Sequence, residues 1–435
     1  MKEIGVGLLG FGTVGAGVVE GLTVNRPLIQ SRLGADVVLR RIGDLDTTSD
    51  RGVKVDPSII IPDAFEVIKD PAVDIVVELI GGTGIARKLV LAALEAGKPV
   101  VTANKKLLAE YGEEIFATAE KNGVDIYFGA SVGGGIPIVR VIREGLVGNA
   151  INHIHGILNG TCNYILTRME REGLPFDEVL ADAQRLGYAE ANPALDIDGF
   201  DTAHKAIILA ALSYGFKAKL EDITVEGIRG LEGIDVRYAR ELGYRIKLLA
   251  TVARDKDDVE VFVAPTLVPE KHMLASVSGV FNAAMVNSDL DDDTLYYGRG
   301  AGRAPTASTV IGDIVDISRN LLAHEVRHPQ ILHKTGNNLR LRPTSEMHHA
   351  FYLRLNVRER PGALGDFAAI LGKHNVSIAA VIQKQPDTAD GKAAVVPVVA
   401  LTHVACEADL EAALDEITAG DVVTGRPVRL RILDA

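Results

Sequence analysis

Short apolar runs alternate with amphipathic stretches over about the first 130 residues. The runs that predict strands are Ile4–Leu9, Val37–Ile42, Ile75–Leu79 and Pro99–Thr102. A helical pattern begins at Val14 behind the first run, and another, Lys88–Ala96, stops at Gly97. Strands that alternate with helices in this way indicate a parallel, doubly wound α/β sheet.

The pattern changes at about residue 150. The next strand-like and helical stretches are Ile151–Leu158, Asp177–Leu186, Thr202–Leu212 and Val259–Leu267. This mixture is typical of a separate α+β unit. A helical pattern returns over residues 306–325, and Pro329–Ser345, rich in Pro, Asn, Thr and Arg, is interpreted as a linker.

The last 85 residues or so predict a third unit. Its expected elements are Phe351–Val357, the turn Arg360–Gly362, Ala363–His374, Ala379–Gln383, Ala393–Leu401, Glu407–Ile417 and Val428–Leu433. Their order, βαββαβ, predicts a small ferredoxin-like sandwich. We expect a first domain over 1–135 with about 305–330, a second over 136–304, a linker over 331–347 and a third domain over 348–435.

Composition and charge narrow the class of protein. The 435 residues are 47% hydrophobic and 24% charged, as in ordinary globular proteins. The net charge of −12 disfavours nucleic acid as a partner. Two cysteines exclude a disulfide framework and fit a reducing compartment. Without a cationic leader or an apolar stretch of ~18–20 residues, we expect a cytoplasmic protein with no membrane partner.

The sequence Gly10-Phe11-Gly12-Thr13-Val14-Gly15 stands between a predicted strand and a predicted helix. Gly10 permits a tight turn, Gly12 lets the backbone approach a diphosphate, and Gly15 allows close packing of helix on sheet. Amides at the helix N-terminus then bind the anion. This context predicts dinucleotide binding, and the alternative is a purely structural glycine turn.

Asp44, after the second predicted strand, is the candidate for contacting the ribose. It lies 29 residues beyond Gly15, against the usual ~20, and the insertion Asn25–Gly34 accounts for the difference. A carboxylate here accepts from ribose hydroxyls and repels a 2′-phosphate, which favours NAD. If Arg40 or Arg41 faces the adenosine pocket, NADP would also bind, and Asp44 could instead only cap a turn.

Two further segments place polar groups near the expected ligand. The strand Val100–Thr102 ends in Ala103-Asn104-Lys105, at the carboxyl edge where doubly wound sheets bind ligands. Lys105 could face cofactor or substrate, or simply begin a surface helix. The cluster Ser131–Pro137 contains three successive glycines, which could cradle a ligand or a monovalent cation or act as a hinge between domains.

The stretch Gly187–Lys205 concentrates carboxylates near one lysine. Asp201 and Lys205 are four residues apart on a predicted helix and share a face. Together with Glu190 and Asp196 they could hold an ammonium group and exchange a proton with an alkoxide. The spacing alone favours the alternative, a common exposed salt bridge. Cys162 has no obvious histidine partner and is interpreted as a packing residue.

These motifs, in this order, resemble those of homoserine dehydrogenases. The matching segments are GFGTVG at 10–15, VVTANKK at 100–106, SVGGGIP at 131–137, GILNGTCNYIL at 156–166, LGYAEANPALDIDGFDTAHK at 186–205 and YYGRGAGRAPTAS at 296–308. The resemblance covers residues 1–330, and the last unit resembles an ACT domain, a module that binds small regulatory amino acids. A fused aspartate kinase would need several hundred more residues, so the chain resembles the monofunctional type.

The resemblance implies a Rossmann-like dinucleotide domain and roles for individual residues. Phe11, Thr13 and Val14 would line the cofactor phosphates, Thr102 and Lys105 would lie near the nicotinamide, and Gly187, Glu190 and Gly302 would touch the cofactor. Glu190, Asp201 and Asp196 would bind homoserine, with Lys205, beside Lys105, as the proton donor or acceptor. Carbonyls of Gly129, Val132, Gly134 and Ile136 would bind sodium or another monovalent cation.

Two positions depart from the family pattern. Gly129 stands where members often carry Glu, and Gly43 stands where NADP-preferring members often carry Arg, which is consistent with NAD. The family further implies a homodimer or homotetramer and threonine as the feedback effector. The rival functions are another amino-acid dehydrogenase on the same scaffold and an inactive, ACT-bearing amino-acid sensor. The retained Lys105, Lys205 and glycine turn argue against the sensor.

Overall fold

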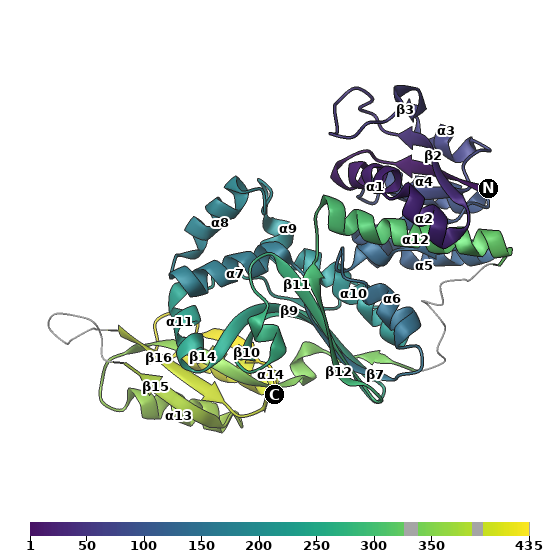
Figure 1. Cartoon of the computed structure of the whole chain (residues 1–435). Helices are drawn as coiled ribbons and strands as arrows, with labels where there is room; N and C mark the ends of the chain where they lie inside the picture. Colours follow the sequence, from purple (N-terminus) through teal and green to yellow (C-terminus); the bar gives the residue numbers. More distant parts are fainter. Residues whose placement is uncertain (326–337, 385–394, 435) are drawn as a thin grey trace.

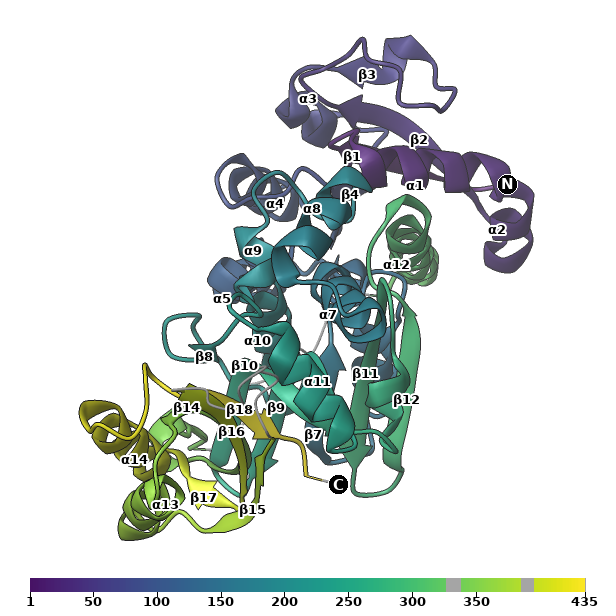
Figure 2. The ribbon, with the colours of Figure 1, turned by 90° about the vertical axis from the view of Figure 1, so that its left-hand side faces the viewer.

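The chain folds into two β-sheets and the helices that cover them (Figure 1). The structure is a computed structural model that describes residues 1–325, 338–384 and 395–434. Within these ranges, no helix combines the length and the apolar character needed to cross a membrane. The first sheet and the C-terminal strands lie at opposite ends of the molecule, with the central part of the second sheet between them (Figures 1 and 2).

The first sheet is entirely parallel. Its strands are β1 (Glu3–Leu9), β2 (Asp36–Gly43), β3 (Ile60–Ile61), β4 (Ile75–Glu78), β5 (Val100–Thr102) and β6 (Ile126–Tyr127). Their order is β3-β2-β1-β4-β5-β6. The direction of winding therefore reverses between β1 and β4, which confirms the predicted doubly wound fold. The strands nearest the middle are buried along almost their whole length because helices cover both faces.

The helices of this first lobe divide between the two faces of the sheet. They are α1 (Thr13–Val24), α2 (Arg26–Leu33), α3 (Ala64–Lys69), α4 (Ile85–Glu95), α5 (Lys105–Asn122) and α12 (Arg303–Ala323). One apolar core joins α1 and α12 to the sheet, and a second joins α3, α4 and α5 to its other face. A Cβ on Gly17 would lie 2.6 Å from the Arg303 carbonyl oxygen, so α1 and α12 pack closely. The predicted insertion Asn25–Gly34 forms α2.

The second sheet runs through the rest of the chain. Its strands are β7 (Ile151–Ile157), β8 (Thr224–Val225), β9 (Tyr244–Asp255), β10 (Asp258–Pro269), β11 (Phe281–Ser288), β12 (Asp292–Arg299), β13 (Arg340–Leu341), β14 (His348–Arg358), β15 (Ile378–Gln383), β16 (Val395–Thr402), β17 (Ala405–Cys406) and β18 (Val428–Ile432). The main order is β12-β11-β7-β9-β10-β18-β14-β16-β15. The remaining helices are α6 (Ile138–Arg140), α7 (Gly160–Glu172), α8 (Phe176–Arg185), α9 (Ala194–Ile197), α10 (Phe200–Tyr214), α11 (Gly233–Glu241), α13 (Ala363–Lys373) and α14 (Glu407–Ala419).

The C-terminal strands and helices form the third unit, which we define as His348–Ile432. Its strand order β18-β14-β16-β15, with α13 and α14 in the connections, is the predicted βαββαβ arrangement. A compact apolar core lies between these helices and the strands. The predicted Ala393–Leu401 strand runs from Val395 to Thr402 in the described residues.

The third unit is not set apart by the predicted linker, because its last strand joins the central sheet. Thr266 and Leu267 of β10 pair with Arg431 and Ile432 of β18 in a parallel register. Within the predicted linker, β13 pairs with the start of β10. Residues 331–337 of that linker lie outside the described part of the chain.

Buried ion pairs strengthen this junction. The Arg354 guanidinium on β14 donates to both oxygens of Asp235 on α11, at 2.6 and 3.0 Å, and the Tyr352 hydroxyl adds a third hydrogen bond. Asp235 is 0% exposed and Arg354 4% exposed. Arg431 of β18 donates to Glu407 and, across the junction, to Glu226 at 3.0 Å. Each pair satisfies charges that the sheet junction has removed from water.

Replacing Arg354 by Met should therefore destabilise the chain strongly. The substitution leaves the Asp235 carboxylate buried without its cation, which costs about 3–5 kcal/mol in comparable pairs. The free energy of unfolding from urea titration measures this loss. Lys373→Met is the control, because Lys373 forms an exposed ion pair with Glu416 within the third unit. Equal free energies of unfolding for the two variants would contradict the role assigned to the buried pair.

Candidate functional site

The predicted glycine turn connects β1 to α1. Gly10 has a φ of +96°, and a Cβ on it would lie 2.8 Å from the carbonyl carbon of Leu79. A Cβ on Gly15 would lie 2.2 Å from the carbonyl oxygen of Gly10, so the helix packs directly on the turn. Gly12, the N-cap of α1, has no atom within 4 Å of its Cβ position. This open helix N-terminus fits the diphosphate of a dinucleotide.

Asp44 connects the end of β2 to the glycine turn. Its Oδ2 accepts a hydrogen bond from the Phe11 amide at 2.6 Å, and its Oδ1 accepts one from the Asp46 amide at 2.9 Å. The carboxylate thus caps a local turn and also holds the glycine turn in place. Phe11 is buried, whereas Thr13 and Val14 begin α1 beside the open N-terminus.

The arginine nearest Asp44 is not one of those expected from the sequence. Arg40 and Arg41 both form ion pairs with other carboxylates of the first lobe. Arg51 instead lies 2.9 Å from Asp46 and 4.0 Å from Asp44, and its Nε is buried without a hydrogen-bond partner. Arg51 stands in an irregular loop, where no periodicity marks it, so sequence reasoning missed it.

Buried polar groups continue along this edge of the sheet. The Thr102 hydroxyl at the end of β5 donates to Glu78 Oε2 at the end of β4, at 2.7 Å, and both residues are 0% exposed. The side chain of Asn104 caps α5 by accepting from the Leu107 amide. This cap orients the first turn of α5, where Lys105 stands. Glu78 was not predicted from the sequence, although it ends a buried strand at the point where the winding reverses.

Lys105 and Lys205 meet at one carboxylate. Asp201 Oδ2 accepts from Lys205 Nζ at 2.7 Å, and Asp201 Oδ1 lies 2.8 Å from Lys105 Nζ. Lys205 also donates to the carbonyl oxygen of Leu158 at 2.5 Å. Asp201 and Lys205 are 4% and 7% exposed, so the exposed-salt-bridge interpretation of their spacing is wrong. Since Lys105 begins α5 and the other two stand on α10, the cluster joins the first lobe to the central unit, α6–α11 and β7–β12.

Burial and charge set the protonation of this cluster. Burial, opposed by Asp201 and reinforced by Lys105, lowers the pKa of Lys205 below its ordinary value. Burial also disfavours charge on Lys105, but Asp201, Asp196 and Glu190 overcome this and raise the pKa of Lys105. Burial would raise the pKa of Asp201, yet the two lysines hold it well below the usual range. Burial is therefore the first cause of the lowered pKa of Lys205, ahead of the positive charge on Lys105.

Asn159 links Asp201 to one further carboxylate, that of Asp196. Its amide nitrogen donates to Asp196 at 2.7 Å and to Asp201 at 2.9 Å, and its oxygen caps α7 by accepting from the Cys162 amide. Burial and the neighbouring Asp201 raise the pKa of Asp196. Glu190 is exposed on the loop before α9, close enough to act on Lys105 through its charge. Asn159 was missed as a site residue, although an Asn before a helical run is a signal for an N-cap.

Three other residues predicted from the sequence differ in their exposure to solvent. Cys162 is buried and free, burial raises the pKa of its thiol, and it donates to the Asp196 carbonyl oxygen, which fits a packing role. Gly187, with a φ of +75°, follows α8 on an exposed loop. Gly302, with a φ of +115°, is the N-cap of α12 and is also exposed.

The glycine-rich loop at residues 129–136 packs against α12. The Gly129 amide donates to the buried carboxylate of Asp313 at 2.8 Å, and a Cβ on Gly129 would lie 2.9 Å from Thr309 Cγ2. Thr309 Oγ1 donates to the Gly134 carbonyl oxygen at 2.7 Å. Two of the four carbonyls expected to bind a cation thus already accept a hydrogen bond, since the Ile136 carbonyl oxygen accepts one from the Ile138 amide at 2.8 Å. Each of the two keeps a second lone pair for a metal. Val132 and Ile136 are buried in the same loop.

The open helix N-terminus after β1 and the two lysines that share the buried carboxylate of Asp201 are features that a nicotinamide-dependent dehydrogenase of alcohols would need. The chain is an NAD(P)-dependent oxidoreductase that acts on a CH–OH group. The homoserine dehydrogenase family matches residues 137–315, and the NAD-binding domain of homoserine dehydrogenase matches residues 10–129. The chain belongs to the homoserine dehydrogenase family, and its third unit, matched over residues 351–419, is an ACT domain.

Named relatives agree with this assignment. The homoserine dehydrogenase of Neisseria gonorrhoeae is 46% identical over 430 residues, which is 97% of each chain. The crystal structure of a homoserine dehydrogenase from Thiobacillus denitrificans is 44% identical, with a TM-score of 0.91 over 100% of this chain and 99% of that one. A hyperthermophilic archaeal homoserine dehydrogenase in complex with NADPH is 28% identical, with a TM-score of 0.63 over 73% of this chain and 98% of that one.

Placing a carboxylate at position 159 should raise the pH at which the enzyme works. Asn159→Asp keeps an oxygen to cap α7 but adds negative charge beside Asp196 and Asp201, which raises the pKa of Lys205. If Lys205 accepts the proton of the substrate hydroxyl, it must be neutral to do so, and the pH of half-maximal homoserine oxidation should then increase. The measurement is turnover against pH. Asn159→Ser, which keeps the cap without the charge, is the control, and coincident profiles for the two variants would refute the expectation.

Proposed function

We propose that this chain catalyses the reversible NAD(P)-dependent reduction of L-aspartate 4-semialdehyde to L-homoserine. The observation that carries the proposal is the Lys105–Asp201–Lys205 cluster, which joins the first lobe to the central unit. Lys105 follows β5 and the glycine turn follows β1, so both belong to the carboxyl edge of the same parallel sheet. Ligands of such sheets bind at this edge.

Lys205 is the proposed proton donor and acceptor. A lysine ammonium has three N–H donors, and Lys205 uses two, on Leu158 and Asp201. The third is left for the oxygen of the substrate. In the reduction, Lys205 donates its proton to the oxygen that becomes the homoserine hydroxyl. In the oxidation, the neutral amine takes that proton back, and burial favours this neutral form.

Lys105 and Asp201 support this transfer. Lys105 stays positively charged and stabilises negative charge that develops on the substrate oxygen. Asp201 orients both amino groups, since each of its oxygens binds one of them. A carboxylate has four lone-pair sites, and Asp201 uses three of them to bind Lys105, Lys205 and Asn159. The fourth is proposed to bind the substrate ammonium group, together with the carboxylates of Glu190 and Asp196.

The glycine turn and its surroundings are proposed to hold the nicotinamide cofactor, which supplies or accepts the hydride when bound. Phe11, Thr13 and Val14 contribute backbone around the phosphates at the N-terminus of α1. By the family resemblance, Thr102 and Lys105 are assigned to the nicotinamide end. The same resemblance assigns Gly187, Glu190 and Gly302 to contact with the cofactor. Gly187 and Gly302 are exposed glycines without a side chain to block a ligand.

We propose NAD as the preferred cofactor. Asp44 directly follows β2, at a position where a carboxylate accepts from ribose hydroxyls and repels a 2′-phosphate. Arg51, 4.0 Å from Asp44, supports some binding of NADP as well, because its buried Nε has no partner among the described residues. Preference for NAD is therefore expected to be partial.

We further propose a monovalent cation, such as sodium, on carbonyl oxygens of Gly129, Val132, Gly134 and Ile136. The support is the family resemblance and the burial of all four residues.

The family also supports assembly as a homodimer or homotetramer. The free cysteines Cys162 and Cys406 fit a cytoplasmic enzyme.

The principal test compares four reactions. Homoserine-dependent reduction of NAD and of NADP is measured on the wild type and on Lys205→Ala. Turnover should fall by orders of magnitude in the variant, while nicotinamide affinity stays near normal, and the wild-type ratio gives the cofactor preference. Lys106→Ala, on the exposed side of the same α5 turn as Lys105, is the control. Turnover unchanged by Lys205→Ala would remove the proposed proton donor.

Threonine is the proposed effector, and it should bind the ACT domain near the turn before α13. Gly362, with a φ of +88°, is the N-cap of that helix. Gly362→Val strains the turn and adds a side chain there, so threonine inhibition should weaken while uninhibited turnover persists. Initial rates over a threonine titration measure both. Deleting the whole domain is a poorer test, because β18 pairs with β10. Full inhibition of the variant would refute the location.

A further inference from the structure

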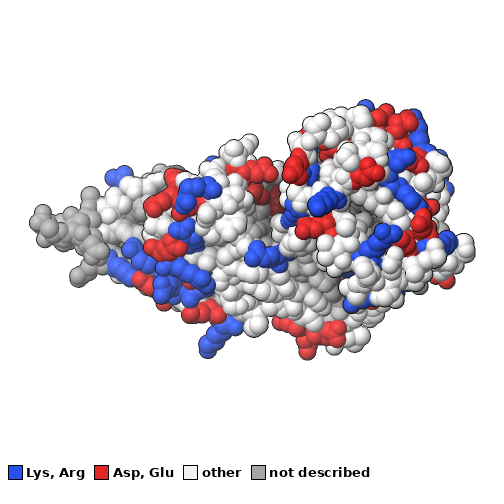
Figure 3. Space-filling model, turned by 45° about the horizontal axis from the view of Figure 1, so that its top comes forward, with Lys and Arg blue, Asp and Glu red and all other residues white. Residues whose placement is uncertain are grey.

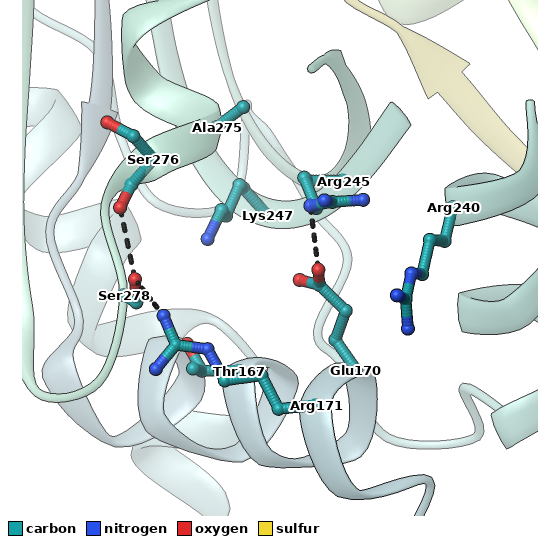
Figure 4. A pocket seen from close by; sticks show the side chains of 9 residues that line it. All are labelled: Thr167, Glu170, Arg171, Arg240, Arg245, Lys247, Ala275, Ser276 and Ser278. Atoms are coloured by element: carbon teal, nitrogen blue, oxygen red, sulfur yellow. Dashed lines mark hydrogen bonds and ion pairs between the residues drawn. The ribbon is translucent and has the colours of Figure 1, made fainter. Parts of the chain in front are cut away.

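A second cavity lies in the central unit, outside the candidate active site. Figure 4 shows this pocket of about 390 Å³ between the C-terminal part of α7, the end of α11, the start of β9 and the segment at 275–278. The side chains that line it are Thr167, Glu170, Arg171, Arg240, Arg245, Lys247, Ala275, Ser276 and Ser278. None of these residues belongs to the lysine cluster or to the glycine turn.

The lining is strongly basic, in contrast to the acidic chain. Four of its side chains are cations, against the single carboxylate of Glu170, which is bound by Arg245 at 2.7 Å. Elsewhere, acidic and basic side chains are interspersed over the face of the molecule that Figure 3 shows. In the described part of the chain, Arg171, Arg240 and Lys247 form no ion pair with a carboxylate. Three of the four cations that line the pocket therefore have no ion-pair partner among the described residues.

Lys247 gives the strongest indication that the pocket binds an anion. It is 2% exposed, and its ammonium group donates only to neutral acceptors, the Val277 carbonyl oxygen at 2.5 Å and Asn163 Oδ1 at 3.4 Å. Burial lowers its pKa to about 8, with Arg245 and Arg171 adding to the shift against Glu170. A buried charge of this kind is costly unless an anion compensates it. In Figure 4 its amino group points into the cavity, on the side of Ser278 and Arg171.

Other donors surround the same space. Arg245 binds Glu170 and Glu270, yet its Nη1 is buried without a hydrogen-bond partner. One Nη of Arg171 donates to Ser278 Oγ at 2.9 Å, which leaves its remaining N–H groups for a ligand. Planar guanidinium forks with a nearby lysine are typical of phosphate recognition.

We propose that this pocket binds the phosphate group of a small anion. Phosphate is favoured over a single carboxylate because three of the lining cations have no ion-pair partner and a phosphate carries more than one negative charge. The cavity volume is also more than ten times the ~30 Å³ share of one water molecule, so it admits an organic group attached to the phosphate. Free inorganic phosphate and a phosphate monoester present the same chemistry, and the experiment separates them.

The position of the pocket gives such a ligand contact with two parts of the enzyme. Its Thr167, Glu170 and Arg171 stand on α7, whose N-terminus is capped by Asn159 in the candidate active site. Its Arg240 stands on α11, which also carries Asp235, the buried partner of Arg354 in the ACT domain. The pocket thus lies between the helix that reaches the lysine cluster and the helix that holds the third unit.

Titration calorimetry on the full chain tests the proposal, with inorganic phosphate and glycerol 3-phosphate as probes against chloride at equal ionic strength. Arg171→Gln and Arg240→Gln should each weaken phosphate binding about tenfold, the loss of one charge-assisted hydrogen bond. Arg237→Gln, also exposed on α11 but outside the lining, is the control. Tighter binding of glycerol 3-phosphate identifies a monoester site, and tighter binding of inorganic phosphate identifies a free-phosphate site.

A second measurement follows the proton on Lys247. A bound anion raises the pKa of Lys247, so phosphate binding near pH 8.5 should take up protons, seen by repeating the titration in buffers of different ionisation enthalpy. Lys247→Met should remove this uptake. Absence of phosphate binding, or binding equal in the wild type and in Arg171→Gln and Arg240→Gln, overturns the proposal. The second result would also place the anion elsewhere, for example at the glycine turn.

Discussion

The arrangement of the candidate site depends on the two ion pairs that the Asp201 carboxylate forms with lysines. This carboxylate binds Lys105 from the first lobe through one oxygen and Lys205 from its own helix through the other. Because Asp201 and Lys205 are buried, each of these two charges needs an opposite charge close by, and Lys105 adds a second cation to Asp201 from the half-buried start of α5. The same contact sets the two lysines apart, since burial lowers the pKa of one while the surrounding carboxylates raise that of the other. Geometry and protonation therefore have one common origin.

A second constraint comes from the continuity of the large sheet. The ACT domain shares β-sheet hydrogen bonds with the central unit, and Asp235, Arg354, Glu226 and Arg431 add charged contacts across the junction. A shift of β14 or β18 would therefore be transmitted directly to β10 and α11. An effector of the ACT domain would act through packed secondary structure rather than through a flexible tether.

The sequence predicts the architecture of each unit better than the way the units join. Compact apolar runs identified β1, β4 and β5, and the βαββαβ pattern identified the third unit, because local periodicity determines these elements. The pairing of β10 with β18 could not be predicted, since no local signal specifies which strand from a distant segment will extend a sheet. The helical spacing of Asp201 and Lys205 placed them on one face but could not tell a buried pair from an exposed one. Arg51, Glu78 and Asn159 were missed because their importance depends on tertiary neighbours, and the roles proposed for the site residues remain predictions.

One edge of β10 is covered piece by piece, by segments that are far apart in the chain. β13 pairs with its beginning, β8 with its middle and β18 with its end. During synthesis the ribosome therefore releases β10 about 160 residues before the strand that completes its cover. Until then, unpaired backbone groups of a long apolar strand remain open to other chains, which is a recognised cause of aggregation. Late truncations or frameshifts should thus reduce the yield of folded enzyme even when every residue of the candidate active site has been made.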